Sequence, residues 1–241
     1  MCKRIAMWSG PRNLSTALMR SFASRSDCEV LDEPFYACYL DATGYNHPMR
    51  ANIIRTQETD FDIIMSKLCA GKIHHKIQYQ KHMAHHMLDH WDRSFIEKLT
   101  NVFLIRSPKK VVRSLGLKLN TFDPKQTGFI QQFELFQLVA EKSGSIPAVI
   151  SADDINRSPE KALRAICAAI GIEFIDSMLK WTLGPHTYDG IWGKHWYKKV
   201  NASTSFVSDR EENLELSREE RNMVKVLKPF YEELEKHKLV F

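Results

Sequence analysis

The feature that most constrains the fold is the segment Ser9–Thr16. It follows an apolar, strand-like run, Lys3–Trp8, and it leads into an amphipathic helix expected over Asn13–Arg25, whose apolar residues recur at helical spacing. A loop between a strand and a helix presents backbone N–H groups at the helix N-terminus, where the partial positive charge favours a phosphate. The sequence therefore predicts an α/β chain with an anion-binding loop near its start.

Several side chains of this loop add to its binding capacity. Arg12 supplies a fixed cation, and Ser15 and Thr16 supply hydroxyl donors. The plainer alternative is a helix that begins at Gly-Pro and is capped by Asn13. No lysine precedes Ser15, so the residue that grips the β- and γ-phosphates in a Walker A loop is absent, which argues against an ATP-hydrolysing enzyme or kinase. The binding candidates are Gly10, Pro11, Arg12, Asn13, Leu14, Ser15 and Thr16.

Strand-like runs and amphipathic helices then alternate, which is typical of a parallel sheet with crossover helices. We expect a single domain, 1–241, of α/β class with about five parallel strands and flanking helices. Residues 35–75 show little period beyond a helical stretch near 60–70, and the run 181–206 reads as a long loop. The further strands are predicted at Cys28–Leu31, Ile77–Lys81, Asn101–Ile105 and Ala148–Ile150, and the helices at about 127–142, Pro159–Ile170 with Gly171 as C-cap, and 217–237.

A second candidate site follows the strand that ends at Ile105. Arg106 ends this strand, where ligands of parallel sheets bind. Ser107 is a suitable N-cap for the next helix, with Pro108 at its first position. Ser114 lies two helical turns beyond Ser107, on the same face. These residues suggest a second oxyanion site, and a capped surface helix with solvated basic residues is the alternative.

Composition excludes several classes of protein. A chain of 241 residues with 44% hydrophobic and 26% charged residues is globular rather than disordered. Its apolar runs are too short for a membrane span, and its start is too short for a signal peptide. Five cysteines without regular spacing indicate a cytoplasmic protein. The net charge of +5 allows an anionic ligand, but no basic run or module indicates nucleic acid.

Taken together, the two segments resemble the sulfotransferase superfamily, whose sulfuryl donor is 3′-phosphoadenosine 5′-phosphosulfate (PAPS). The family's P-R/K-x-G-T/S-T loop matches Arg12, Ser15 and Thr16, with Leu14 in place of the glycine. A bacterial and plant branch of sulfotransferase-like proteins shares two more motifs with this chain. They are Asp-Glu-Pro-Phe at 32–35 and Trp-Tyr-x-x-Val-x-x-Ser at 196–203.

The resemblance implies a P-loop NTPase-like fold and transfer of a sulfuryl group from PAPS to a hydroxyl or amine of a small molecule or glycan. It implies that Arg106 and Ser114 bind the 3′-phosphate, and that Lys194, Trp196 and Tyr197 come from a loop that closes over the donor. The histidine of the family's Lys-x-His is shifted or absent here, since the run reads Lys81-His82-Met83.

The residues for catalysis follow from the chemistry. Arg12 keeps its protons, so its role in the in-line displacement is electrostatic. Glu33 is the first candidate for the base, with Asp32 as a neighbour that could exchange roles, and His82 and His85 are the next candidates. No metal is required, and the histidine pairs lack the spacing of a metal site. The alternatives are a P-loop-type phosphotransferase and a nucleotide-binding protein without turnover; the sequence does not indicate the oligomeric state.

Overall fold

A computed structural model describes residues 2–119, 122–207 and 215–241 of the chain. Its centre is a five-stranded sheet in the order β2-β3-β1-β4-β5, in which every neighbouring pair is parallel. The predicted α/β class with about five parallel strands is therefore confirmed. The strands are β1 (Lys3–Ser9), β2 (Cys28–Asp32), β3 (Ile77–Met83), β4 (Thr100–Ile105) and β5 (Ala148–Ser151).

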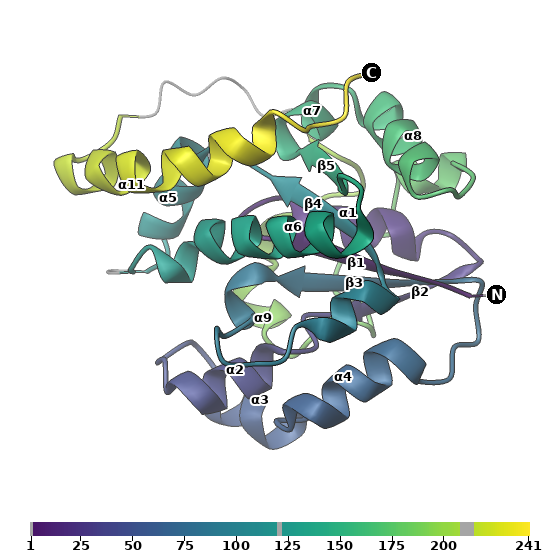
Figure 1. Ribbon diagram of the computed structural model, residues 1–241, viewed down its shortest axis with the longest axis horizontal. Helices are drawn as coiled ribbons and strands as arrows, with labels where there is room; N and C mark the ends of the chain where they lie inside the picture. Colours follow the sequence, from purple (N-terminus) through teal and green to yellow (C-terminus); the bar gives the residue numbers. More distant parts are fainter. Residues whose placement is uncertain (1, 120–121, 208–214) are drawn as a thin grey trace.

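Helices cover both faces of this sheet (Figure 1). In Figure 1 α6 lies in front of the sheet, and α5 and α11 lie together at one side. The helices are α1 (Ser15–Ala23), α2 (Tyr36–Thr43), α3 (Arg50–Thr56), α4 (Phe61–Ala70), α5 (Pro108–Gly116), α6 (Phe129–Ser143), α7 (Ala152–Arg157), α8 (Pro159–Ala169), α9 (Gly193–Trp196), α10 (Lys198–Asn201) and α11 (Arg218–Glu235), with short 3-10 helices η1 (Ala84–His86), η2 (Ser94–Lys98), η3 (Lys125–Thr127) and η4 (Asp176–Leu179).

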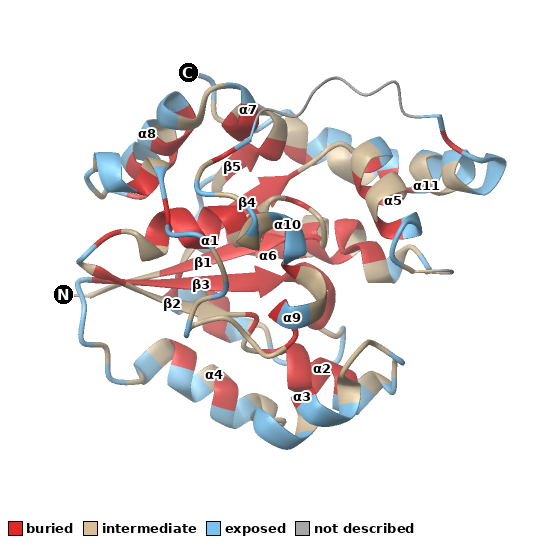
Figure 2. Ribbon diagram, turned by 180° about the vertical axis from the view of Figure 1, so that it is seen from behind, coloured by how far each residue is buried: buried red, intermediate tan, exposed pale blue. Residues whose placement is uncertain are grey.

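The alternation of side chains along β1 divides the core into two layers. Ile5 and Met7 pack on one face of the sheet, against residues of α1 and α8. Ala6 and Trp8 pack on the other face, against residues of α4 and α6. Because both faces are covered, β3 is buried along its whole length and β1 and β4 are buried beyond their first two residues, and Figure 2 shows these strands mostly red. The polar loops that leave the carboxyl ends of these strands are thus held on a rigid platform.

The backbone around the first loop differs from the prediction. The helix begins at Ser15 rather than Asn13, because Arg12 and Leu14 adopt left-handed conformations with φ of 63° and 68°. Leu14 therefore occupies the cap position without a capping side chain. Ser107 does precede α5 as predicted, but its side chain makes no capping hydrogen bond. The loop is shaped by backbone conformation rather than by a conventional cap.

The two segments that showed little period are also structured. Residues 35–75 contain α2, α3 and α4, and α2 buries five consecutive residues, Tyr36 to Leu40, so no amphipathic pattern could mark it. The predicted loop at 181–206 contains α9 and α10, each only one helical turn long. Among the described residues, no helix is long and apolar enough to cross a bilayer.

Candidate active site

Two sequence-predicted segments meet where β1 and β4 end. Arg106, which follows β4, donates from Nη1 to the carbonyl oxygen of Arg12 at 2.7 Å. Arg12 in turn donates from Nε to the hydroxyl oxygen of Ser114 on α5 at 2.9 Å. The loop after β1 and the strand-helix unit of β4 and α5 therefore form one cluster of donors, which we call the basic cluster: Arg12, Arg106 and Ser114.

The electrostatics of the basic cluster suit an anion. Burial, and then the neighbouring charge of Arg106, lower the pKa of Arg12, so both effects disfavour its cationic form. Among the described side chains, no carboxylate pairs with the Arg12 guanidinium. A bound anion would offset both effects, since charge-assisted hydrogen bonds from arginine to phosphate are strong.

Packing from behind fixes the shape of the loop. A side chain at Gly10 has no room, since its Cβ would lie 2.5 Å from the carbonyl oxygen of Thr127. Gln132 on α6 donates from Nε2 to the carbonyl oxygens of Trp8 at 3.0 Å and of Leu104 at 2.9 Å. It thereby ties the ends of β1 and β4 together. The Asn13 amide lies 3.2 Å from both the Gly10 nitrogen and the Pro11 carbonyl oxygen, which closes the loop on itself.

A second cluster lies where β2 and β3 end, and we call it the carboxylate network: Asp32, Glu33, Lys81 and Tyr197. Asp32 pairs with Lys81 in the register of the two strands. The ammonium group of Lys81 lies 2.9 Å from Asp32 Oδ1 and 2.5 Å from Glu33 Oε1, and it donates to the Tyr197 hydroxyl at 2.6 Å. The sequence motifs at 32–35 and 196–203 are thus parts of one buried network.

Burial and charge shift the pKa values in this network. Burial raises the pKa of Glu33, with Lys81 acting against that shift and Asp32 adding to it. For Lys81, burial opposes the charged form, but Asp32 and Glu33 outweigh it, so its pKa is raised. The lysine is therefore a permanent cation at neutral pH, while Glu33 is the group disposed to take up a proton.

The structure places the two histidine candidates in different surroundings. His82 lies in the apolar core, stacked on Trp8 with ring centroids 4.4 Å apart, and it also faces Phe35. His85 lies on η1, where its Nδ1 is 3.6 Å from the position a Gly128 Cβ would take. Burial lowers the pKa of both to about 3. Both rings are therefore neutral near pH 7 and are weak bases.

His85 belongs to a ring cluster that sequence reasoning did not identify. His86 stacks between Tyr36 and Tyr39, with centroids 4.7 Å from each. The Tyr36 hydroxyl hydrogen-bonds His47 Nδ1 at 2.9 Å. The density of histidine in this part of the sequence was the available signal, but only the fold shows that these rings pack with the tyrosines of α2.

The late segment, residues 181–206, is held by contacts with α1 and with the end of β2. Arg20 on α1 makes a bidentate ion pair with Asp189, at 2.5 and 2.7 Å, and also donates to Asn201 at 3.1 Å. Tyr197 supplies the second attachment, at Asp32. Of the three late-segment candidates, Tyr197 is therefore buried in the carboxylate network, Trp196 is half-buried and Lys194 is exposed on α9.

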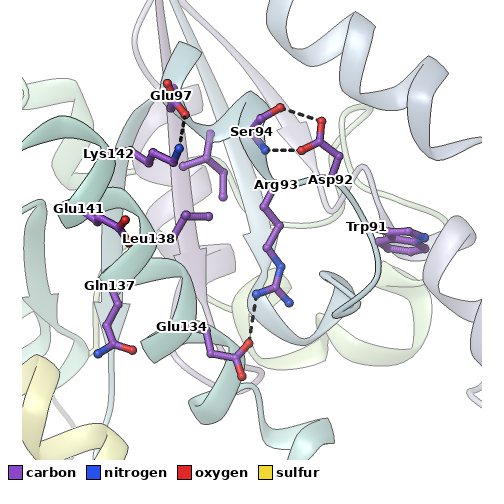
Figure 3. A pocket seen from close by; sticks show the side chains of 11 residues that line it. Trp91, Asp92, Arg93, Ser94, Glu97, Glu134, Gln137, Leu138, Glu141 and Lys142 are labelled. Carbon is purple, nitrogen blue, oxygen red and sulfur yellow. Dashed lines mark hydrogen bonds and ion pairs between the residues drawn. The ribbon is translucent and has the colours of Figure 1, made fainter.

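A surface groove between η2 and α6 contains none of these residues (Figure 3). Four of its charged side chains form ion pairs within the groove: Arg93 with Glu134 at 3.1 Å and Lys142 with Glu97 at 3.8 Å. The described residues also hold no group of three His, Cys, Asp or Glu side chains arranged for a metal ion. The two clusters at the strand ends are accordingly the candidate site.

Comparison with known proteins agrees with this fold. A family model described as "Sulfotransferase domain" matches residues 3–238. Among solved structures, a sulfotransferase from Alicyclobacillus acidocaldarius has a TM-score of 0.57 at 12% identity, covering 100% of this chain and 98% of that one. The sulfotransferase domain from the curacin biosynthetic pathway has a TM-score of 0.50 at 13% identity, covering 95% and 98%. At these identities the structural likenesses show the P-loop-like fold alone.

The chain belongs to the sulfotransferase domain family. Two curated proteins of Arabidopsis thaliana, named branched-chain-amino-acid aminotransferase-like proteins 1 and 2, are 36% and 34% identical to it over 207 residues. The aligned part covers 86% of this chain but 37% of each relative. This chain thus spans little more than a third of the length of those relatives, and their name describes much longer proteins.

Proposed function

We propose that this protein is a PAPS-dependent sulfotransferase, which moves a sulfuryl group from PAPS to a hydroxyl or amine of a small molecule or glycan. The observation that carries the proposal is the chain of contacts from Arg106 to the Arg12 carbonyl oxygen and from the Arg12 guanidinium to Ser114. It joins the two segments that the family resemblance assigns to the 5′-phosphosulfate and the 3′-phosphate. A nucleotide with phosphates at both positions matches two adjacent anion sites.

In this proposal the loop 10–16 and the basic cluster bind and orient the donor. The backbone N–H groups at the start of α1, with Ser15 and Thr16, hold the 5′ group, and Arg106 and Ser114 hold the 3′-phosphate. Arg12 stabilises the charge that develops on the leaving phosphate oxygen, and it transfers no proton. Lys194 and Trp196 belong to the late segment that would cover the donor.

The displacement forms a bond between the acceptor oxygen or nitrogen and sulfur, and it breaks the bond between sulfur and the bridging oxygen. That bridging oxygen leaves on 3′-phosphoadenosine 5′-phosphate (PAP), and the acceptor's proton must go to a base. We assign this role to Glu33, whose raised pKa makes its carboxylate a better proton acceptor than His82 or His85. No metal is required in this proposal.

A thermal-shift comparison tests the donor assignment. PAP, 5′-AMP, ADP and Mg-ATP are added at equal concentration to the full chain. A ligand at about 100 times its dissociation constant adds about 2.7 kcal/mol to stability, which is several degrees for a chain of this size. We expect the largest increase in melting temperature with PAP, without added metal.

The competing functions give different patterns in the same experiment. A largest shift with Mg-ATP would contradict the proposal and favour a P-loop-type phosphotransferase. Binding of PAP without any transfer from ³⁵S-labelled PAPS to a broad mixture of hydroxyl and amine compounds would indicate a nucleotide-binding protein without turnover. Transfer of label to one compound class would identify the acceptor.

A further inference from the structure

We infer that Lys81, Asp32 and Tyr197 are positioning residues that control the protonation of Glu33, and that the late segment reaches the base through a single hydroxyl, that of Tyr197. The inference rests on the proposed function, because Glu33 is the base only there. It assigns roles to Lys81 and Asp32 and a different role to Tyr197, which becomes a support of the base instead of a contact of the donor.

The hydrogen-bond capacity of Lys81 is fully used. Its side chain is 1% exposed, and its three N–H donors meet three acceptors: Asp32 Oδ1, Glu33 Oε1 and the Tyr197 hydroxyl. A buried ammonium group with three acceptors cannot reorient without leaving one of them unsatisfied. Lys81 is therefore a fixed charge that holds one oxygen of Glu33 in place.

The single proton of the Tyr197 hydroxyl is also assigned by its neighbours. Lys81 and the indole Nε1 of Trp192 both donate to this oxygen, at 2.6 and 3.0 Å, and so occupy its two lone pairs. Its proton lies between Asp32, whose oxygens are both 2.8 Å away, and Glu33 Oε1 at 3.3 Å. The hydroxyl of the late segment thus bonds Asp32 most closely and makes a longer contact with the base.

Asp32 and Glu33 consequently play different parts. Asp32 also accepts from the backbone N–H of Gly190 at 2.9 Å, so both of its oxygens have donors. Glu33 has one oxygen on Lys81, and no described residue donates a hydrogen bond to its Oε2. That oxygen is the one free to accept a proton from an acceptor molecule.

The backbone supports the same assignment. Glu33 has a φ of 44°, in the left-handed region that side chains rarely adopt. Such a conformation is held only where the surroundings enforce it, and it is found most often at functional sites. The turn points the carboxylate back at Lys81, one strand away.

The titratable groups that face Glu33 act on it with different signs. Asp32, which precedes it, and Tyr36 on α2 lie close enough to interact with its charge. The Asp32 charge raises the pKa of Glu33, whereas Lys81 and the Tyr197 hydroxyl lower it. Removing the charge of Asp32 should therefore lower the pKa of Glu33, and removing the Tyr197 hydroxyl should raise it.

An NMR titration of the full chain, labelled with ¹³C at glutamate side-chain carboxyls, measures this directly. The Glu33 signal is the one absent from the Glu33→Gln spectrum. We expect Tyr197→Phe to shift the Glu33 titration to higher pH and Asp32→Asn to shift it to lower pH. Tyr231→Phe is the matched control, because among the described residues its hydroxyl bonds Glu235 alone, at 2.7 Å, and it should leave the Glu33 signal unchanged.

Tyr197→Phe keeps the ring beside Lys81, 4.8 Å from the ammonium to the ring centroid, and removes one oxygen, so it carries the test if Asp32→Asn fails to fold. A Glu33 titration that does not rise in Tyr197→Phe overturns the inference, and so do shifts of the same sign in both variants. The thermal shift with PAP is measured on each variant. If PAP does not raise the melting temperature of the wild type, the proposed function is wrong, but the NMR result on Glu33 is unaffected.

Discussion

The basic cluster and the carboxylate network lie at the same edge of one sheet and are built in opposite ways. In the basic cluster, Arg106 lowers the pKa of its neighbour Arg12, so cations are brought together at a cost. In the carboxylate network, Lys81 has two carboxylate partners and a hydroxyl, and every donor is used. In the first arrangement Arg12 gains when an anion binds, while in the second Lys81 already has its partners in the protein itself. A site can therefore combine a ligand-dependent half with a preformed half.

The largest expected effect comes from the one group of the network that has a free oxygen. Glu33→Gln should reduce turnover by about 10²- to 10⁴-fold, the usual contribution of a general base. Steady-state transfer from ³⁵S-labelled PAPS to the identified acceptor measures it. The increase in melting temperature with PAP should stay the same, because the donor contacts the basic cluster and not the carboxylate network. Unchanged turnover would remove Glu33 as the base.

The next effect tests whether the carboxylate network is complete without ligand. Lys81→Met leaves two buried carboxylates without their cation, and such losses cost about 3–5 kcal/mol of folding free energy. Urea denaturation without ligand measures this cost. Lys67→Met is the control, because Lys67 and Glu58 form an exposed pair 3.7 Å apart, worth at most about 1 kcal/mol. Equal costs for both variants would contradict a preformed network.

The basic cluster should respond to substitution through ligand affinity. Arg106→Ala should weaken PAP binding by about 10- to 100-fold, the value of a charge-assisted hydrogen bond, and should weaken 5′-AMP binding far less. Calorimetric titration with both nucleotides measures the two changes. Arg164→Ala, which removes a surface pair with Glu160, should change neither affinity. Equal losses for PAP and 5′-AMP would refute the 3′-phosphate assignment.

The buried, neutral histidines His82 and His85 should make the stability of the protein depend on pH. The folded-state pKa of His82 and His85, about 3, lies below the value near 6.5 expected when the chain is unfolded, so the unfolded chain binds more protons. Stability should therefore fall as the pH drops from about 6.5 toward 3, by up to about 1.4 kcal/mol per pH unit for each histidine. Denaturation curves at about pH 6 and pH 5 measure the slope. His82→Phe should reduce this slope by the contribution of one histidine, up to about 1.4 kcal/mol per pH unit. An unchanged slope would contradict the prediction.

The smallest effect concerns backbone strain next to the basic cluster. Leu14 has a φ of 68°, which costs about 1–2 kcal/mol for a residue with a side chain, while glycine loses about 0.5–1 kcal/mol in chain entropy. Because the Leu14 side chain also packs against the core, the comparison is with Leu14→Ala, which removes the same contacts but keeps the strain. Leu14→Gly should have an unfolding free energy about 0.5 kcal/mol higher than that of Leu14→Ala in urea denaturation. Thr16→Gly, inside α1, should lower the unfolding free energy by about 0.5–1 kcal/mol. A Leu14→Gly variant less stable than Leu14→Ala would show that Leu14 is not strained.

The sequence predicted the sheet well because buried parallel strands are apolar runs, as in β1, β4 and β5. β3 was harder to predict, since Gln78, Gln80 and Lys81 are all buried polar residues. Their side chains are satisfied by partners outside the strand, such as the hydrogen bond from Gln80 Nε2 to the carbonyl oxygen of Leu68 at 3.0 Å. Hydropathy cannot register such partners.

The candidate site likewise contains residues that the sequence could indicate and residues that it could not. The positions of Arg12 and Arg106 could be predicted because both residues follow the ends of strands, and Ser114 because it lies two helical turns beyond Ser107 on the same helix. The role of Lys81 could not, although a lysine late in a strand, with Asp-Glu at the end of another strand, was an available signal. Tyr197 was expected beside the donor, and its hydroxyl instead lies on Asp32, a contact across 165 residues that no local pattern encodes.

The left-handed residues Arg12 and Leu14 carry a kinetic consequence. The loop that contains them is held by contacts within the protein, since Gly10 lies against Thr127 and Gln132 ties the ends of β1 and β4 together. An anionic ligand that arrives there has no chain to order. Its association should therefore be a single step, with an observed rate that rises linearly with ligand concentration and falls as salt screens the approach.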